Sequence, residues 1–202
     1  MFLGYSQLLN SFDSGLTTKI TINNRRLNRK DFENNILISR FEDELDKCIC
    51  CQGMCVISGT DPQPIIVNSH LGRYAVVTVA KINNQREIAE ELLAERMHFS
   101  EMSANKINQT ELVALLINMG ESFVDGINKV YNKIEGSCSM LILTEDGLIA
   151  ARDLLGRTPI SIGKKEDAYA VAVETTSFPN LDYEKVYDLG PGEIVRLHAD
   201  GY

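Results

Sequence analysis

The strongest constraint in the sequence is a block of short apolar segments in its last third, separated by turn signals. Each segment is rich in β-branched or small apolar residues, which is typical of strands. Turn residues at Asp146-Gly147 and at 165–167 separate them, and Asp-Gly suits a tight primed hairpin turn. We therefore expect neighbouring antiparallel strands over Ser139–Leu143, Leu148–Arg152, Pro159–Ile162 and Tyr169–Val173.

Helical patterns are grouped in the middle of the chain instead of alternating with strands. Residues 86–97, 110–120 and 121–134 repeat apolar side chains at helical spacing, and Gly120 is a stop signal. Two strands across a turn at 69–72 precede them. Grouped helices and hairpin-linked strands predict an α+β fold with antiparallel sheets, in a single domain over 1–202.

The flanking segments give a coarser pattern. A further strand is expected after Pro191-Gly192. In the first third we expect a helix over 1–14, a strand over 16–22, a polar loop with a basic cluster over 25–30, a short acidic helix over 36–47 and a strand over 48–58.

Charge and hydropathy exclude several classes of function. The 202 residues carry a formal charge of -8, which argues against bulk attraction to nucleic acid or anionic lipid. No stretch is apolar for long enough to span a membrane, and the first residues lack the basic start of a signal peptide. We therefore expect a cytoplasmic protein with neither nucleic acid nor membrane as a partner.

The five cysteines are the candidate metal ligands or nucleophiles. Cys48, Cys50, Cys51 and Cys55 are crowded together, and Cys138 stands alone. Their spacing differs from paired C-x-x-C zinc motifs and no histidine lies nearby. An apolar run of cysteines also suits a buried strand. The spacing favours reduced, metal-free thiols, and we expect no metal and no cofactor.

A family resemblance enters through the last third of the chain. GSCSMLILTEDGLIAARDLLGRTPISIG, AVAVETTSF and LGPGEIVRL together resemble the second half of a class II glutamine amidotransferase domain. The resemblance is nearest to the N-terminal glutaminase domain of amidophosphoribosyltransferases, the family that starts purine synthesis. Weaker likeness extends upstream through PQPIIVN, NNQREIAEELL and NQTELVALLI. The matching motif residues are Asp146, Gly147, Arg152, Asp153, Gly156, Arg157, Pro159, Gly163, Glu174, Pro191, Gly192, Glu193 and Ile194.

The resemblance implies an N-terminal nucleophile hydrolase fold, a four-layer α/β/β/α sandwich of antiparallel sheets. The first strand of that fold has no counterpart in this sequence. In the family, an N-terminal cysteine attacks the glutamine amide and its α-amine acts as the base. An Asn side chain and a Gly N–H stabilise the oxyanion, and an Arg and an Asp hold the α-carboxylate and α-amine of glutamine.

The sequence departs from the family at nearly all of these positions. The glutamine-binding Arg falls near Met54, and the Asp that holds the amine becomes Gln109. The oxyanion segment becomes Thr78, Val79 and Ala80, where the valine has no amide to donate. We therefore assign no catalytic residue and expect a degenerate substrate pocket at these five positions.

The retained motif residues admit two interpretations. Arg152, Asp153 and Arg157 suit either a structural charge network at the end of a strand or a ligand site, and the first interpretation is favoured. Gly156 suits a turn that needs an unusual backbone conformation. Glu174 completes the set of motif residues to which we assign a structural role.

Two functional hypotheses of different classes follow. In the first, the chain is a non-catalytic binding or regulatory module, with a protein partner, a second copy of itself or a small molecule as its ligand. In the second, it is an active glutaminase domain whose cysteine nucleophile lies upstream of Met1 or on another chain. A different hydrolase on the same scaffold is a third alternative. The missing glutaminase residues favour the first hypothesis.

Overall fold

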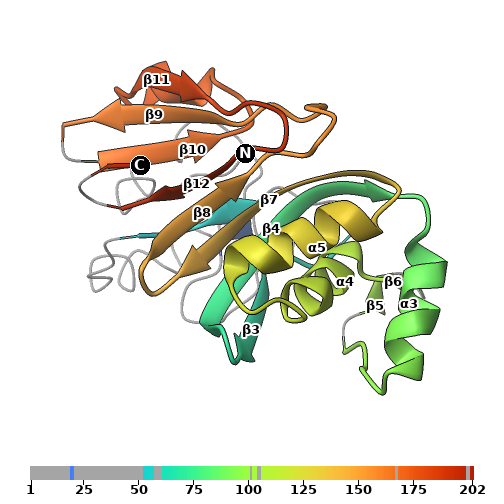
Figure 1. The fold of residues 1–202 in the computed structure, drawn as a ribbon. Helices are drawn as coiled ribbons and strands as arrows, with labels where there is room; N and C mark the ends of the chain where they lie inside the picture. The colour runs from blue at the N-terminus through green and yellow to red at the C-terminus, as the bar shows by residue number, and fades with distance from the viewer. Residues whose placement is uncertain are drawn as a thin grey trace, which may run out of the picture.

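Two antiparallel β-sheets stacked face to face form the centre of the computed structural model, and helices cover the outer face of the larger sheet (Figure 1). The structure describes residues 19–20, 52–56, 61–100, 102–103, 106–166, 168–198 and 201–202. None of the helices within these ranges is long and apolar enough to cross a membrane.

The larger sheet has five strands in the order β12-β8-β7-β4-β3, and all neighbours in it are antiparallel. Its longest pairing joins β4 to β7, from Tyr74↔Thr144 to Ile82↔Gly136. The strands are β3 (Ile65–Ser69), β4 (Gly72–Ile82), β7 (Gly136–Thr144), β8 (Gly147–Ala151) and β12 (Ile194–Leu197).

Three helices cover one face of this sheet, and two of them begin at side-chain caps. The Asn108 side chain accepts the N–H groups of Thr110 and Glu111, and the Ser122 side chain accepts that of Asp125. Caps of this kind satisfy N–H groups that have no partner inside the helix. The helices are α3 (Gln85–Ala94), α4 (Gln109–Ile117) and α5 (Phe123–Lys133).

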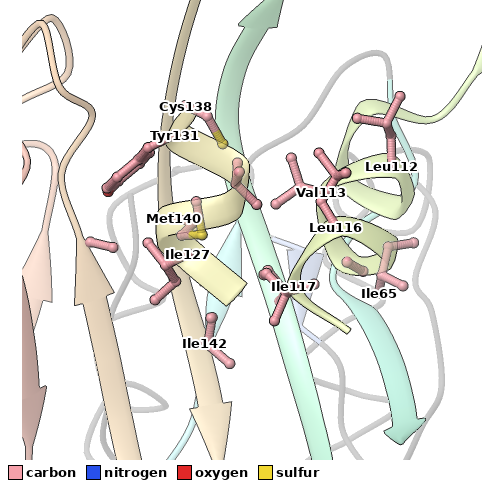
Figure 2. Close-up of a cluster of buried hydrophobic side chains, with 14 of the residues drawn as sticks. Ile65, Leu112, Val113, Leu116, Ile117, Ile127, Tyr131, Cys138, Met140 and Ile142 are labelled. Carbon is pink, nitrogen blue, oxygen red and sulfur yellow. The ribbon is translucent and has the colours of Figure 1, made fainter. Parts of the chain in front are cut away.

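The first core lies between these helices and the sheet. Figure 2 shows apolar side chains of α4 and α5 directed toward those of β7 and β3. Alternate residues of β7 face this core because side chains of a strand alternate between its two faces. The labelled members are Ile65, Leu112, Val113, Leu116, Ile117, Ile127, Tyr131, Cys138, Met140 and Ile142.

The second core lies between the two sheets. Val77 and Leu141 of the larger sheet pack with Ile162 and Val171 of the smaller one. The smaller sheet has the order β10-β9-β11, with β9 (Ser161–Lys165), β10 (Ala168–Ala172) and β11 (Glu184–Asp188).

A short helix, α6 (Ser177–Asn180), lies on the outer face of the smaller sheet. Its Phe178 packs on the small side chains of β10 and against Gly163 of β9, where a Cβ would lie 2.9 Å from the ring. The layers therefore run helix, sheet, sheet, helix. This order confirms the expected α+β sandwich of antiparallel sheets.

The three expected helices and the hairpin of β3 and β4 are present, but the four expected C-terminal strands do not form one continuous set. β7 pairs with β8, and β9 pairs with β10, in two different sheets. The expectation that the second and third segments are neighbours is wrong. Residues 152–160 cross from one sheet to the other, which a tight turn could not do.

The turn between β7 and β8 also differs in type from the sequence-based expectation. Thr144 pairs with Gly147, so Glu145 and Asp146 are the central residues. Neither has the positive φ that a primed turn needs, and the positive value (131°) falls on Gly147 itself. The glycine is required there because a Cβ would lie 2.3 Å from the Leu197 carbonyl oxygen.

Several elements were not expected. β11 has no buried residue, so it lacks the alternation that marks a strand in sequence. The small hairpin of β5 (Met102–Ser103) and β6 (Lys106–Ile107) was not expected either. The strands β1 (Lys19–Ile20) and β2 (Cys55–Val56) pair antiparallel, and they lie within the strands expected over 16–22 and 48–58.

Most of the predictions for the first third lie outside the described residues. These are the helices over 1–14 and 36–47, the basic loop, and Cys48, Cys50 and Cys51. Within the strand expected over 48–58, the structure describes 52–56 and assigns only Cys55–Val56 as a strand.

Helices α4 and α5 meet where two glycines bring their backbones into contact. A Cβ on Gly126 would lie 2.3 Å from the Ile117 carbonyl oxygen, and a Cβ on Gly120 would lie 2.3 Å from the Gly126 nitrogen. Backbone atoms cannot rotate away as a side chain can. The absence of a side chain at Gly126 therefore sets how closely the two helices pack.

Gly126→Ala should destabilise the protein by about 1–3 kcal/mol, the range for overpacking a filled core. This reverses the usual sign, because alanine inside a helix is ordinarily better than glycine by roughly 0.5–1 kcal/mol. Urea unfolding measures the difference. Asn128→Ala, at an exposed position of the same helix, is the control and should change stability by less than about 0.5 kcal/mol. An unchanged midpoint for Gly126→Ala would contradict the close contact.

Candidate functional site

The positions that the resemblance links to glutamine binding lie on the part of β4 that extends past its neighbour β3. β3 pairs with β4 only as far as Ile65↔Val76, so residues 77–82 have no strand on that side among those described. On the other side, β4 stays paired with β7 as far as Ile82↔Gly136. The candidate site is therefore an open strand edge at the end of the sandwich.

Side chains along this end of β4 alternate between the two cores. Val76 and Ile82 belong to the core under the helices, and Val77 is fully buried between the sheets. Val79 faces the same side as Val77 but is 41% exposed. The core between the sheets therefore opens between these two valines, and an apolar side chain lies at the opening.

The side chain of Gln63 replaces a strand neighbour at Thr78. Thr78 N–H donates to Gln63 Oε1 at 2.8 Å, and Gln63 Nε2 donates to the Thr78 carbonyl at 3.2 Å. The Thr78 and Thr110 hydroxyls lie 2.7 Å apart in a further hydrogen bond. Thr78 is held within the scaffold, because each of its polar atoms already has a protein partner.

Gln109 occupies the far end of the same edge, where its Oε1 accepts the N–H of Ile82 at 3.1 Å. Alternate residues of a strand direct their backbone groups to the same edge. Ala80, between Thr78 and Ile82, therefore directs its N–H and C=O there as well. Within the described part of the chain these two groups have no hydrogen-bond partner. They are the backbone groups of this edge that a ligand could contact.

Met54 lies away from this edge, in the apolar cluster between the sheets. It shares that cluster with Val77 and Leu141. A buried thioether supplies neither a charge nor a strong hydrogen-bond donor for a carboxylate. The structure thus brings Thr78, Ala80 and Gln109 to one strand edge and places Met54 inside the core.

Asp153 organises the loop that follows β8. Its side chain is buried, and its backbone N–H donates to Ser139 Oγ at 3.0 Å. The carboxylate accepts hydrogen bonds of 3.0–3.3 Å from the N–H groups of Leu155, Arg157 and Thr158 and from the Ser139 hydroxyl. A carboxylate with four such donors needs no cation to be stable when buried.

Arg152 joins this loop to the connection between β11 and β12. Its Nη1 donates to the Leu189 carbonyl at 2.5 Å, and its Nη2 donates to the Gly156 carbonyl at 2.7 Å. Its own carbonyl accepts the Tyr131 hydroxyl at 2.8 Å. Arg152 therefore fastens two loops and helix α5 together at one end of the sandwich.

The retained charged residues thus act on the backbone instead of on one another. No ion pair among the described residues joins Arg152 to Asp153. Arg157 is exposed, and so is Glu174, whose carboxylate accepts the Thr176 N–H at 3.3 Å. In place of the expected charge network, Arg152 donates hydrogen bonds to loop carbonyls and Asp153 accepts them from loop N–H groups.

The sequence did not predict the contacts of three side chains that have a clear structural role. Gln63 caps the edge of β4, and Ser139 joins β7 to the Asp153 loop. Glu193 closes the Pro191-Gly192 turn by accepting the Gly190 N–H at 2.6 Å. Gln63 lies in the PQPIIVN segment and Glu193 in the LGPGEIVRL segment, so the motifs contained a signal for both positions but not for the contacts.

Cys138 is a free cysteine, and it is buried under α5 (Figure 2). Burial raises the pKa of its thiol well above the usual range, and the nearby charge of Asp153 raises it further. A thiol that stays protonated is a poor nucleophile. Within the described residues no group of three or more His, Cys, Asp or Glu side chains could hold a metal ion.

Comparison with known proteins gives one consistent result. A family model described as a glutamine amidotransferase domain matches residues 53–180. The amidophosphoribosyltransferase of Methanocaldococcus jannaschii is 30% identical over 135 residues, which are 67% of this chain and 28% of that protein. That of Bacillus subtilis is 30% identical over 142 residues, 69% of this chain and 29% of its own length. The chain thus spans less than a third of these relatives.

Solved structures show the same fold. The glutamine phosphoribosylpyrophosphate amidotransferase from B. subtilis, complexed with ADP and GMP, superposes with a TM-score of 0.75 at 22% identity. The match covers 99% of this chain and 47% of that one. A structure described as the allosteric regulatory enzyme of purine biosynthesis gives a TM-score of 0.74, also at 22% identity. These likenesses confirm the resemblance on which the fold was expected.

Asp153→Asn should destabilise the protein by roughly 3 kcal/mol. The variant replaces one carboxylate oxygen with an NH₂ group, so at least one backbone N–H that now donates to Asp153 would face another donor and lose its acceptor. Chemical denaturation measures the loss. Arg157→Ala, in the same loop but with an exposed side chain, is the control and should stay within about 0.5 kcal/mol of the parent. Equal losses in the two variants would show that the carboxylate does not organise this loop.

Cys138 should resist thiol alkylation in the native protein and react once the protein is unfolded in denaturant. The reason is its burial, which both blocks access and keeps the thiol protonated. Raising the pH past the ordinary thiol range should therefore not speed its labelling. Mass mapping of the tryptic peptide 134–152 isolates this cysteine from the other four. Rapid native labelling of that peptide would contradict the buried position.

Proposed function

The chain belongs to the glutamine amidotransferase domain family, of the class II type found in amidophosphoribosyltransferases, and we propose that it is a member that no longer hydrolyses glutamine. In this proposal the domain keeps the fold and works as a binding or regulatory module. One solved structure of the same fold is described as an allosteric regulatory enzyme of purine biosynthesis. We propose a regulatory role for this domain in that same context.

The observation that carries the proposal is the state of the strand edge at the end of β4. Val79 presents an apolar side chain at the opening between the sheets, where the resemblance implies an amide donor. Gln109 uses its carbonyl oxygen on the Ile82 N–H, where the resemblance implies a carboxylate for an amine. The amide donor expected at position 79 is therefore missing, and the side chain at position 109 is used in a structural hydrogen bond.

Amide hydrolysis by this class of enzyme needs a nucleophile as well as oxyanion donors. Cys138 does not meet the first need, because its thiol is buried and protonated. Met54 does not meet the need for a cation that would hold an α-carboxylate. With Met54 where the resemblance implies an Arg, the α-carboxylate of a bound glutamine would lack a charge-assisted hydrogen bond worth roughly 1.5–3 kcal/mol.

One observation favours the rival hypothesis of an active glutaminase. The Ala80 N–H lies on the open edge of β4 without a partner among the described residues, as an oxyanion donor should. If a cysteine from outside the described residues attacked glutamine at this edge, the Ala80 N–H would remain as one donor to the oxyanion. Removing a single donor of this kind lowers a hydrolase's rate by about 10²–10³, so a weakened activity is the signature of this alternative.

Purified protein should release no glutamate from glutamine above a buffer blank, and glutamine should not shift its melting temperature. Both measurements belong on one sample, whose intact mass defines the N-terminus that was assayed. Val79→Asn restores one amide donor at an exposed position and should leave turnover at the blank, because this change supplies no nucleophile.

A glutaminase of known activity, assayed in parallel, shows that the conditions support turnover. Glutamate release that a thiol-alkylating glutamine analogue abolishes would establish a cysteine nucleophile and reject the proposal. Glutamine binding without turnover would keep the loss of hydrolysis and assign glutamine as the ligand of the module.

A further inference from the structure

Two Asp-Gly pairs lie in very different surroundings in the described structure. The pairs are Asp125-Gly126 and Asp146-Gly147, and a third, at 200–201, includes a residue outside the described ranges. In an Asp-Gly pair the glycine has no side chain to shield its backbone nitrogen. That nitrogen can attack the preceding side-chain carboxyl carbon whenever the local backbone is free to bring the two atoms together.

Asp146 lies in the two-residue turn between β7 and β8 and is exposed. Its backbone N–H donates to Thr144 Oγ1 at 3.2 Å. Its carboxylate makes no hydrogen bond or ion pair with the described residues. Gly147 is itself buried, and its carbonyl accepts the Thr144 hydroxyl at 2.9 Å, but it belongs to the closing pair of the hairpin, where a strand ladder frays first.

Asp125 has the same sequence neighbour but is held in place. Its carboxylate accepts the Glu121 N–H at 3.0 Å and pairs with Lys129 at 3.4 Å. The N–H of Gly126 donates to the Ser122 carbonyl at 2.8 Å. The hydrogen bond from the Glu121 N–H and the charge of Lys129 hold the pKa of Asp125 below its usual range, and an ionised carboxylate is the less reactive form toward a nitrogen nucleophile.

From this contrast we propose that Asp146 is a site of spontaneous modification, at which the native protein isomerises to isoaspartate while Asp125 is protected. The Gly147 nitrogen loses its proton and bonds to the Asp146 side-chain carbon, which loses hydroxide, so that one water leaves and a cyclic imide forms. Water then adds to the imide. Opening at the α-carbonyl gives isoaspartate, and opening at the side-chain carbonyl restores aspartate.

Isoaspartate places one extra methylene in the backbone of the turn. The turn has no room for it without a change in the pairing of Thr144 with Gly147. Gln52 Nε2 donates to the Thr144 carbonyl at 2.8 Å, so this contact changes too. The modified protein should therefore melt at a lower temperature than the fresh protein. The group created is a substrate for enzymes that methylate isoaspartyl carboxyl groups with S-adenosylmethionine.

Trypsin separates the three Asp-Gly pairs into peptides 107–129, 134–152 and 197–202. The protein is incubated in neutral buffer at physiological temperature, digested, and assayed for isoaspartate with an isoaspartyl methyltransferase and by mass spectrometry. Isoaspartate should accumulate in peptide 134–152 at least roughly tenfold faster than in 107–129. This ratio is expected because Asp125 must first break a charge-assisted hydrogen bond, to the Glu121 N–H, that Asp146 does not have.

The same incubation in urea measures the effect of local sequence alone, because the protein is unfolded. In urea the aspartates of the two peptides should isomerise at similar rates. Asp146→Glu keeps the charge and should abolish the signal in 134–152 without changing the melting temperature of fresh protein. Equal native rates for the two peptides, or a faster rate in 107–129, would overturn the proposal. An unequal ratio that persists in urea would assign the difference to local sequence and overturn it as well.

Discussion

The long antiparallel pairing of β4 with β7 is the constraint on which the rest of the structure depends. It runs without a shift from Tyr74↔Thr144 to Ile82↔Gly136, so the register of one strand fixes that of the other. Each strand then presents alternate residues to the core under the helices and to the core between the sheets. A slip of one residue would exchange the two faces, placing Ser139 under the helices and Met140 between the sheets. Both cores and the candidate site follow from this single register.

Hydrogen bonds to loop backbones hold the two sheets in their relative positions. Asp153 fixes the loop that leaves the larger sheet, and Arg152 fastens it to the Leu189 carbonyl, where the chain leaves the smaller one. Glu193 then closes the turn that returns the chain to β12. These contacts explain why a stretch of loop can carry the most recognisable motifs in the chain. Arg152, Asp153 and Glu193 each satisfy backbone groups of these loops, which need partners in a folded chain.

The scaffold and the catalytic chemistry of this family can separate because they use different atoms. Gln63 and Thr110 complete the open edge of β4 by bonding to Thr78, and these contacts do not depend on which side chain stands at position 79. Val79 is partly exposed, so a change from a polar to an apolar residue there has little effect on the core. A member of the family can therefore lose the groups that recognise glutamine while the sandwich stays intact. The proposed non-catalytic role rests on this separation.

Local sequence patterns determined the elements whose residues alternate or repeat strongly. The three helices, the β3–β4 and β7–β8 hairpins and the pairing of β9 with β10 follow from periodicity and turn residues that act over a few positions. The motifs also identified the family.

Tertiary structure alone decided that β8 and β9 enter different sheets, because the loop between them is shaped by Ser139, from a strand earlier in the chain. It alone showed β11, which no periodic pattern marks, and the contacts of Gln63 and Gln109 with β4. Partners such as these lie fourteen or more residues apart, and a hydrogen bond between them exists only once the fold has brought them together.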